Sequence, residues 1–483
     1  MQLKTLLQGI DVLELHADAA LELSGVQYDS RRVQPGELFV AVSGFQTDGH
    51  VYIPKAVENG AVCVLCEKAP TVQVPYVLVR DARAALAALG ANWFGHPAGK
   101  LCMIGVTGTN GKTTSTYLLK HVLEQTLGAK VGLIGTIQNM IGQTVLETER
   151  TTPESFELQA LLAQMVQAGC THVVMEVSSH ALLLHRVDAI GFAVGVFTNL
   201  TEDHLDFHKT MDAYCDAKAL LFAQCKTGAV NVDDAYAGRM LRAARCPMLT
   251  SSAQAREADL RAEAVQLSAE RVEFEAVYRG ERVPVRLGIP GAFSVYNALS
   301  VLSAGLALGI PLQAMAEALA TAQSVKGRVE VVPTPGQDYT VLIDYSHTPD
   351  SLENVLNAVR GFCKGRVIAV FGCGGDRDPF KRPIMGGIAA RLADVSIVTS
   401  DNPRTEDPYG ILRQIVAGMQ DTQNPYEVIE SRTAAIGRAM QLAQKDDIIV
   451  LCGKGHETYQ EIGHEKRHLD EREVVAAYLE GRT

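Results

Sequence analysis

The residues best suited to chemistry form a glycine-rich run that ends in a lysine and two threonines. The run, Gly105-Val-Thr-Gly-Thr-Asn-Gly-Lys-Thr-Thr114, follows an apolar stretch at residues 101–106 and precedes an amphipathic stretch. Backbone N–H groups of such a strand-to-helix loop bind phosphates, its lysine reaches the outer phosphates, and the next hydroxyl binds Mg²⁺. The sequence therefore predicts a nucleotide site, with an ordinary glycine-rich turn as the alternative. Its residues would be Gly108, Thr109, Asn110, Gly111, Lys112, Thr113 and Thr114.

Two candidate metal ligands follow other strand-like runs of the same segment. Glu176 ends the run at residues 172–176, and His204 follows the run at residues 192–197. Both would lie at the carboxyl ends of parallel strands, on the edge that carries the phosphate loop, where P-loop enzymes complete their Mg²⁺ site. A strand-end acid and a structural histidine without metal are the alternatives. Three neighbours fit the spacing as well as His204 does: Asp203, Asp206 and His208.

Four polar clusters come directly after four strand-like runs in the last third of the chain. They occupy residues 344–349, 372–378, 401–404 and 453–457. Because the carboxyl ends of parallel strands meet at one edge of a sheet, we expect the four clusters to line one binding site. Arg377 and Arg404 could each bind a carboxylate, and Glu457 could bind an amine, which suits an amino-acid ligand. Taken singly, each could instead form a surface ion pair.

The elements that position these residues predict an α/β protein of three domains, since domains average about 150 residues. Strand-like and helix-like runs alternate, which favours parallel sheets with crossover helices. We expect a small N-terminal α/β domain at residues 1–92, a central P-loop parallel-sheet ATPase domain at 93–332, and a C-terminal Rossmann-like domain at 333–483. Residues 254–286 are more polar and predict an antiparallel side sheet.

The composition excludes several classes of protein. With 47% hydrophobic and 20% charged residues, the chain is neither disordered, collagen-like nor a coiled coil. A net charge of −11 argues against a general nucleic-acid or membrane-surface binder. Ten cysteines are too few for a disulfide scaffold, and Cys63 and Cys66 read as buried strand thiols. The start lacks a signal peptide, and residues 290–316 predict a buried helix rather than a membrane span, so we expect a cytoplasmic protein.

These motifs, in this order, resemble the Mur ligase family, which also includes the folylpolyglutamate synthases. The resemblance covers essentially the whole chain and includes Met175-Glu-Val-Ser-Ser-His180 and Tyr214-Cys-Asp-Ala-Lys218. Asp401-Asn-Pro-Arg404 resembles the signature of members that add meso-2,6-diaminopimelate rather than L-lysine. The resemblance implies an ATP-dependent ligase that joins meso-diaminopimelate to the D-glutamate carboxylate of UDP-N-acetylmuramoyl-L-Ala-D-Glu. The reaction would pass through an acyl phosphate and belong to cytoplasmic peptidoglycan precursor synthesis.

The resemblance also implies roles for individual residues. The catalytic residues would be Lys112, Glu176, His204 and Lys218. The Mg²⁺ ligands would be Thr113, Glu176, His204 and Lys218 as a carbamate, with a solvated helix lysine as the alternative for Lys218. Further ATP contacts would be Asn297, Arg328, Asp344 and His347. The UDP-N-acetylmuramoyl dipeptide would contact Tyr28, Ser30, Phe45, Gln46, Thr47, Thr151, Thr152, Ser178 and Arg186. Diaminopimelate would contact Arg377, Asp401, Asn402, Pro403, Arg404, Gly453 and Glu457.

The implied partners are ATP, the UDP-linked dipeptide and meso-diaminopimelate, with Mg²⁺ as cofactor, no nucleic acid, no membrane and a monomeric state. Three alternatives keep the architecture: a lysine-adding ligase, a dipeptide-adding ligase and a folylpolyglutamate synthase. The cluster at residues 401–404 argues against the last two. A P-loop regulator that does not ligate is an alternative of another class. Such a protein needs no separate amino-acid pocket, and the third segment has a candidate one.

Overall fold

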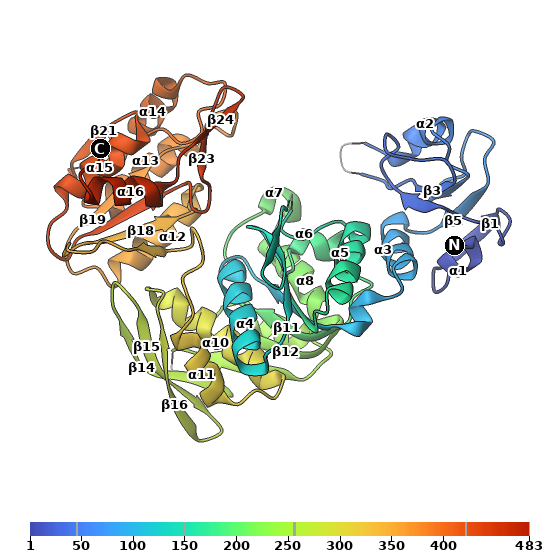
Figure 1. The fold of residues 1–483 in the computed structure, drawn as a ribbon, viewed down its shortest axis with the longest axis horizontal. Coiled ribbons are helices and arrows are strands. Elements are labelled where there is room, and N and C mark those ends of the chain that lie inside the picture. Colours follow the sequence, from blue (N-terminus) through green and yellow to red (C-terminus); the bar gives the residue numbers. More distant parts are fainter. Residues whose placement is uncertain (45–46, 149, 255–256, 421–422, 483) are drawn as a thin grey trace. The chain divides into compact units, whose positions relative to one another are not determined.

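The computed structural model describes residues 1–483 except 45–46, 149, 255–256, 421–422 and 483. Figure 1 shows the helices and strands coloured along the sequence. Contacts divide the chain into two compact units. The first comprises residues 1–250 and 303–310, and the second comprises residues 251–302 and 311–483. The domain boundaries predicted at residues 92 and 332 differ from this division and remain a prediction.

The first unit begins with a five-stranded sheet in the order β1-β5-β4-β3-β2, parallel except for the pair β1–β5. Its strands are β1 (Val12–His16), β2 (Gly25–Gln27), β3 (Glu37–Val40), β4 (Cys63–Cys66) and β5 (Tyr76–Val79), with helices α1 (Leu3–Leu6), α2 (Ile53–Glu58) and α3 (Ala82–Trp93). Both thiols of β4 are buried and free, as predicted. Burial raises the pKa of Cys63 to about 12 and that of Cys66 to about 11, so both thiols stay protonated and inert.

A larger sheet of the first unit contains the parallel order β12-β11-β6-β10-β7, extended by antiparallel β8 and β9. Its strands are β6 (Cys102–Thr107), β7 (Val131–Ile134), β8 (Asn139–Ile141), β9 (Thr144–Leu146), β10 (His172–Glu176), β11 (Phe192–Phe197) and β12 (Cys225–Asn231). Its helices are α4 (Lys112–Leu127), α5 (Ser155–Gln167), α6 (Ser179–Leu183), α7 (Leu205–His208), α8 (Met211–Ala219) and α9 (Ala237–Ala243). The parallel sheet predicted for this segment is confirmed, and it brings the ends of β6, β10 and β11 to one edge.

The second unit opens with an antiparallel meander, β14 (Leu260–Leu267), β15 (Val272–Tyr278) and β16 (Glu281–Leu287), which confirms the predicted antiparallel strands but not a separate sheet. β13 (Met248–Ser252) precedes it and pairs with β14 in parallel. The uncharged stretch at residues 290–316 is largely buried, as predicted, but it forms α10 (Ala292–Ala307) and the start of α11 (Leu312–Ala320) rather than one helix, because Gly309 and Pro311 interrupt it. In the part of the chain that the structure describes, no helix combines the length and the apolar run needed to cross a bilayer.

A six-stranded sheet in the order β17-β18-β22-β19-β20-β21 organises the rest of the second unit. All pairs are parallel except β17–β18. The strands are β17 (Glu330–Val332), β18 (Thr340–Asp344), β19 (Val367–Phe371), β20 (Val395–Val398), β21 (Tyr426–Val428) and β22 (Ile448–Cys452). The helices are α12 (Pro349–Arg360), α13 (Lys381–Leu392), α14 (Pro408–Ala417), α15 (Arg432–Leu442) and α16 (Glu471–Leu479). The strands β23 (Tyr459–Ile462) and β24 (Glu465–His468) form a separate hairpin.

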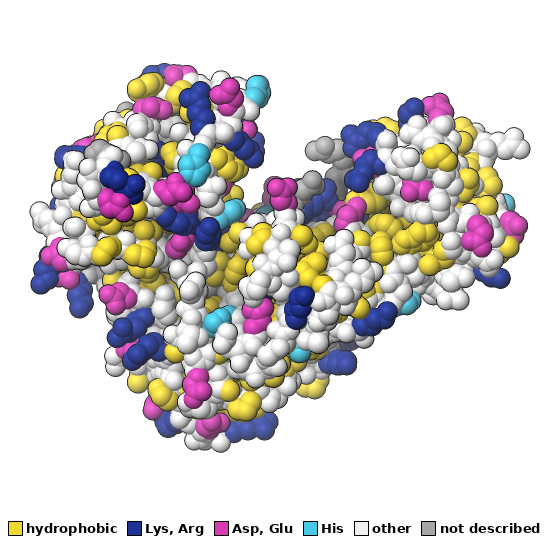
Figure 2. All heavy atoms as spheres, viewed as in Figure 1, with side chains coloured by type: hydrophobic (Ala, Val, Ile, Leu, Met, Phe, Trp, Pro, Cys, Tyr) yellow, Lys and Arg dark blue, Asp and Glu magenta, His cyan; other side chains and the backbone are white. Residues whose placement is uncertain are grey.

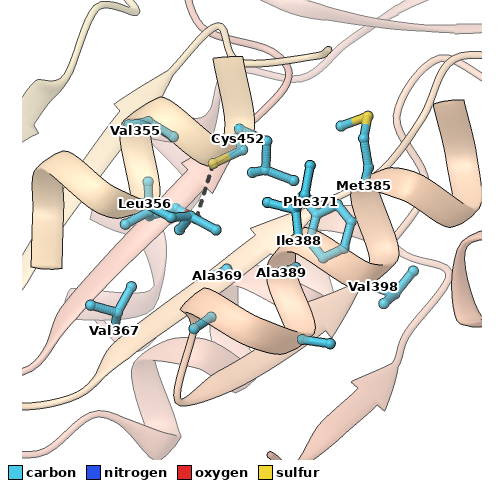
Figure 3. Close-up of a cluster of buried hydrophobic side chains, with 14 of the residues drawn as sticks. Val355, Leu356, Val367, Ala369, Phe371, Met385, Ile388, Ala389, Val398 and Cys452 are labelled. Atoms are coloured by element: carbon cyan, nitrogen blue, oxygen red, sulfur yellow. Dashed lines mark hydrogen bonds between the residues drawn. The ribbon is translucent and has the colours of Figure 1, made fainter. Parts of the chain in front are cut away.

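Helices cover both faces of this sheet, and its central strands β19 and β22 are apolar and buried at every position. One face packs on α12, α13 and α14 through residues such as Leu356, Met385 and Ile388 (Figure 3). The other face packs on α15 and α16 through residues such as Ile436 and Val475. Helix α12 begins at Pro349, because the Thr348 side chain caps it and proline suits the first helical turn.

Charged groups are distributed differently at the surface and inside the second unit. Figure 2 shows Lys and Arg side chains interspersed with Asp and Glu on the viewed face, so the net charge is not gathered in one patch there. Inside, the fully buried Arg432 of α15 pairs with the equally buried Glu471 of α16 at 2.8 Å. The Arg432 guanidinium also donates to the Cys452 carbonyl oxygen at 2.8 Å and lies 3.9 Å from Asp401.

Replacing Arg432 with methionine should destabilise the protein strongly, since methionine keeps most of the volume but leaves Glu471 buried without its partner. Breaking a buried pair on one side costs about 3–5 kcal/mol of unfolding free energy. Denaturant unfolding of the full chain measures this loss. The matched control is Arg438→Met on the same helix, because the Arg438–Glu427 pair is more than a third exposed and should contribute little. Equal unfolding curves for the two variants would contradict the prediction.

Candidate active site

The glycine-rich loop packs tightly against the segment that follows β11. Gly108 has a φ of +147°, and a Cβ at this position would lie 1.9 Å from the Thr198 hydroxyl oxygen. The Asn110 backbone N–H donates to the Asn199 side-chain oxygen at 2.9 Å, and the Thr198 hydroxyl donates to the Asn110 carbonyl oxygen at 2.7 Å. The loop therefore has a fixed shape that only glycine permits at position 108.

Lys112 begins α4 directly after this loop. Its ammonium group donates to the carbonyl oxygens of Gly108 at 2.9 Å and Thr109 at 2.8 Å, so the side chain folds back over the loop. Thr113 and Thr114 follow it and are buried at the start of the helix. A lysine above a loop at a helix N-terminus is an arrangement that binds the phosphates of a nucleotide.

Glu176 lies fully buried at the end of β10, beside Val106 of β6. One carboxylate oxygen accepts from the Thr136 backbone N–H at 2.9 Å and the other from the Thr136 hydroxyl at 3.0 Å. Each oxygen of a carboxylate can accept two bonds, so both retain the capacity to bind a cation. The Thr136 hydroxyl contacts that of Thr151 at 3.0 Å, which links Glu176 to a second predicted site residue.

His204 and His208 differ in burial, although their spacing alone does not separate them. The His204 side chain is 48% exposed, with Nε2 3.4 Å from the Asp203 carboxylate. His208 is buried, its Nε2 contacts the Ser179 hydroxyl at 2.8 Å, and burial lowers its pKa to about 4. Its surroundings therefore favour a structural role for His208, and His204 is the more accessible of the two predicted candidates.

Lys218 of α8 is almost completely buried beneath the phosphate loop. Its Nζ donates to the Gly108 carbonyl oxygen at 2.8 Å and lies 4.4 Å from the centre of the Tyr214 ring. Burial, and then the charge of Lys112, hold the pKa of Lys218 well below its ordinary value. A neutral amine is the form that reacts with CO₂, so this environment suits the predicted carbamate.

The predicted metal ligands suit Mg²⁺ that enters with a nucleotide. Among the residues with described positions, no group of three His, Cys, Asp or Glu side chains could hold a metal ion by itself. Mg²⁺ usually takes only one or two protein carboxylates and completes its shell with phosphate oxygens and water. The predicted ligands fit this coordination, since they include one buried carboxylate, one threonine hydroxyl and one accessible imidazole.

The second unit carries the predicted amino-acid site on loops that interlock after β19 and β20. A Cβ on Gly372 would lie 2.2 Å from the Thr399 carbonyl oxygen, and one on Gly375 would lie 1.9 Å from that of Pro403. Arg404 then donates from Nη1 to the Gly375 carbonyl oxygen at 2.8 Å. Arg377, in the first of these loops, is exposed and donates to the Asp376 carbonyl oxygen.

Asn402 joins this pair of loops to the loop that follows β22. Its side-chain amide donates to Glu457 at 3.0 Å, and its side-chain oxygen accepts from the buried Lys454 ammonium at 2.5 Å. Lys454 also lies 3.3 Å from Glu457 and 3.8 Å from Asp401. A Cβ on Gly453 would lie 2.4 Å from the Asp401 carboxylate, so this loop also approaches closely.

The remaining predicted residues of the second unit lie at and just after the end of β18, directly before β17 and on α10. Asp344 accepts from the backbone N–H groups of Val329 and Ser346, both at 2.9 Å. The His347 Nδ1 atom lies 2.9 Å from the Tyr345 carbonyl oxygen. The Arg328 guanidinium lies 5.3 Å from the Tyr345 ring centre, within cation–π range. Asn297 is buried on α10.

The residues predicted to bind the UDP-linked dipeptide lie in the first unit. Tyr28 donates to Glu157 at 2.7 Å, Ser30 is buried, and Thr47 is exposed. Phe45 and Gln46 lie outside the described residues.

The rest of that predicted set surrounds the end of β10. The Thr152 hydroxyl donates to the Glu176 carbonyl oxygen at 2.9 Å, and the Ser178 hydroxyl caps α6. Arg186 pairs with Glu154 at 2.6 Å and donates to the Thr152 carbonyl oxygen at 3.1 Å.

Known proteins match this chain along almost its whole length. Family models match at residues 22–94 (Mur ligase family, catalytic domain), 106–305 (Mur ligase middle domain) and 327–455 (Mur ligase, glutamate ligase domain). A Clostridium acetobutylicum protein named UDP-N-acetylmuramoyl-L-alanyl-D-glutamate--2,6-diaminopimelate ligase 1 is 47% identical over 99% of both chains. The chain belongs to the Mur ligase family. A Caldanaerobacter subterraneus subsp. tengcongensis ligase of the same substrates by name is 48% identical over 99% of both chains.

Solved structures of Mur ligases have the same fold. The structure of a UDP-N-acetylmuramoyl-L-alanyl-D-glutamate--2,6-diaminopimelate ligase is 31% identical, with a TM-score of 0.75 over 100% of this chain and 99% of that chain. MurF from Acinetobacter baumannii is 19% identical, with a TM-score of 0.63 over 99% of this chain and 98% of its own. The predicted α/β architecture of three Mur ligase parts is therefore confirmed.

Sequence reasoning missed several residues that support the sites of this Mur ligase. Thr136 holds Glu176, and Lys454 holds Asn402. Lys454 lies inside the 453–457 cluster, so its position after a strand could have marked it as a site residue. Its complete burial could not be read from the sequence. The buried Arg382 of α13 pairs with Glu406 at 2.8 Å, which fixes the helix beside the 401–404 loop.

Replacing Gly108 with alanine should weaken ATP binding by roughly tenfold or more, because the backbone conformation costs about 1–3 kcal/mol for other residues. The added methyl group must also displace the Thr198 hydroxyl, which holds the loop. Titration calorimetry with an ATP analogue measures the change. Gly191→Ala is the matched control in the same unit, since its Cβ would meet nothing within 4 Å. Unchanged affinity in the Gly108→Ala variant would contradict the loop's role.

Proposed function

We propose that this chain is an ATP-dependent ligase that joins meso-2,6-diaminopimelate to the D-glutamate carboxylate of UDP-N-acetylmuramoyl-L-Ala-D-Glu. The observation that carries the proposal is the presence, in one chain, of a phosphate loop topped by Lys112 and a separate polar cluster that contains Arg404, Asn402 and Glu457. Two relatives of that name, 47% and 48% identical over nearly the full length, support the choice of substrates.

The reaction must overcome the poor electrophilicity of a carboxylate. Transfer of the γ-phosphoryl group of ATP to the D-glutamyl carboxylate gives an acyl phosphate with a good leaving group. Lys112 would move from the loop carbonyls to the β- and γ-phosphates and stabilise the charge that develops between two anions. Mg²⁺, held by Thr113, Glu176, His204 and carbamylated Lys218, would supply further neutralisation of the phosphate oxygens.

The polar cluster of the second unit would bind the amino acid whose amine is the nucleophile. Glu457 and Asn402 would bind one end of the diaminopimelate molecule, and Arg404 would bind a carboxylate of the same molecule with two hydrogen bonds. The free amine then attacks the acyl carbon, and the tetrahedral intermediate releases phosphate to leave the amide. We assign ATP to residues 93–332, the amino acid to 333–483 and the UDP moiety to 1–92. We place the reaction in the cytoplasm, where ATP is available, and expect a monomer.

The test is phosphate release from Mg-ATP in the presence of UDP-N-acetylmuramoyl-L-Ala-D-Glu, with meso-diaminopimelate or L-lysine added in parallel. We expect turnover with diaminopimelate, a product whose mass is that of the amide, and loss of turnover when EDTA removes Mg²⁺. Turnover with lysine alone would overturn the choice of amino acid. ATP binding without turnover for either amino acid would favour the non-ligating regulator.

A further inference from the structure

The β23–β24 hairpin is joined to the 401–404 loop at successive positions. The Gln460 side chain donates to the Asp401 carbonyl oxygen at 2.7 Å, and the Glu461 N–H donates to the Asn402 side chain at 2.9 Å. The Arg404 N–H donates to the Glu461 carbonyl oxygen at 3.1 Å, and the Gly463 N–H donates to the Arg404 carbonyl oxygen at 2.8 Å. The hairpin therefore fixes the backbone of Arg404, which has a φ of +49°.

The same hairpin also fixes the Arg404 side chain. Arg404 donates from Nε to the Glu461 carboxylate at 2.9 Å and from Nη1 to the Gly375 carbonyl oxygen at 2.8 Å. Both side chains are about three-quarters or more buried. A guanidinium has five N–H groups in one plane, so these two bonds set that plane and leave the outer edge for a ligand.

The charge of Glu461 has a second consequence for recognition. The carboxylate lies against the positive charge that an incoming carboxylate would otherwise find alone. Attraction at a distance is thereby weakened, and a ligand gains most from hydrogen bonds at the outer edge of the guanidinium. A guanidinium held in this way should bind a correctly placed carboxylate more tightly than other negatively charged groups.

We propose that Glu461 is a positioning residue that orients Arg404 toward the distal carboxylate of the amino acid. This inference rests on the proposed function and deepens it. Through Arg404, Glu461 sets the preference for an amino acid with a second carboxylate over the same amino acid without one. Meso-diaminopimelate and L-lysine form such a pair, since lysine lacks only the distal carboxylate.

Steady-state kinetics of the full chain test this inference. In Glu461→Ala we expect KM for meso-diaminopimelate to rise about tenfold, with KM for ATP unchanged within about twofold. The kcat/KM ratio of diaminopimelate to lysine should fall by a similar factor. Where lysine turnover is too slow, its inhibition constant against diaminopimelate replaces kcat/KM. Glu461→Gln should restore most of the preference, because its amide oxygen can accept from Arg404 Nε.

Glu465→Ala is the matched control, because Glu465 lies exposed on the other strand of the same hairpin. It should behave like the wild type. If Glu461→Ala does not fold, Glu461→Asp withdraws the carboxylate by one methylene and should show the same selective loss. Equal losses for both amino acids, or an unchanged ratio, would overturn the inference while the ligase assignment stands. A wild type that ligates neither amino acid would overturn the proposed function and this inference with it.

Discussion

The Lys112→Ala variant should lose phosphoryl transfer almost completely, with kcat reduced roughly 10²- to 10³-fold or more. The ammonium group lies at the mouth of the phosphate loop, within 2.9 Å of two loop carbonyl oxygens, and is the cation placed to reach the outer phosphates. Its loss leaves two anions to approach each other with less compensating charge. Single-turnover measurement of ADP formation tests this directly, since it does not depend on the amide-forming step.

Lys226→Ala provides the control for the loss of one positive charge from the same sheet. Lys226 is exposed near the start of β12, at the edge opposite the phosphate loop. Its replacement should leave single-turnover rates unchanged. Normal ADP formation by Lys112→Ala would remove the phosphate loop from the mechanism, and an equal loss in both variants would assign the effect to overall charge.

The Arg404→Ala variant should raise KM for meso-diaminopimelate about 10- to 100-fold, because hydrogen bonds to a charged group contribute about 1.5–3 kcal/mol. KM for ATP should stay near the wild-type value, since Arg404 contacts Glu461 and Gly375 rather than the nucleotide loop. Initial rates at varied concentrations of each substrate separate the two constants.

Arg413→Ala is the control for this variant. Arg413 lies on nearby α14 and forms a largely exposed pair with Asp407, so its removal should not change either constant. A parallel rise in KM for ATP and diaminopimelate in Arg404→Ala would argue against a dedicated amino-acid pocket.

The sheets were predictable because buried parallel strands are short runs of apolar residues with no alternation. Residues 367–371 and 395–398 have this pattern, and they form β19 and β20, each followed by one of the predicted polar clusters. The polar clusters after them meet at one edge because the strands are parallel. Boundaries were less certain where capping decides, as at Thr348, since a proline that starts α12 is not part of the apolar period.

The supporting residues of the sites could not be predicted from sequence because their partners are remote along the chain. Arg404 is held by Glu461, 57 residues later, and Glu176 by Thr136, 40 residues earlier. Nothing in the local pattern around Glu461 marks it, since it is one of several charged residues in a polar hairpin. Long-range pairs of this kind depend on strand order and loop approach, which a single sequence does not specify.

The Arg432–Glu471 pair has a consequence for the order of events during synthesis. Arg432, 3.9 Å from Asp401, acquires its buried partner only when α16 has left the ribosome. Domains generally fold from the N-terminus as the chain emerges. The phosphate loop and its surrounding strands can therefore fold while translation continues, whereas the packing behind Asp401 is complete only when residues 471–479 have emerged. A nascent chain stalled before residue 471 would therefore carry a formed phosphate loop while Arg432 still lacks its partner Glu471.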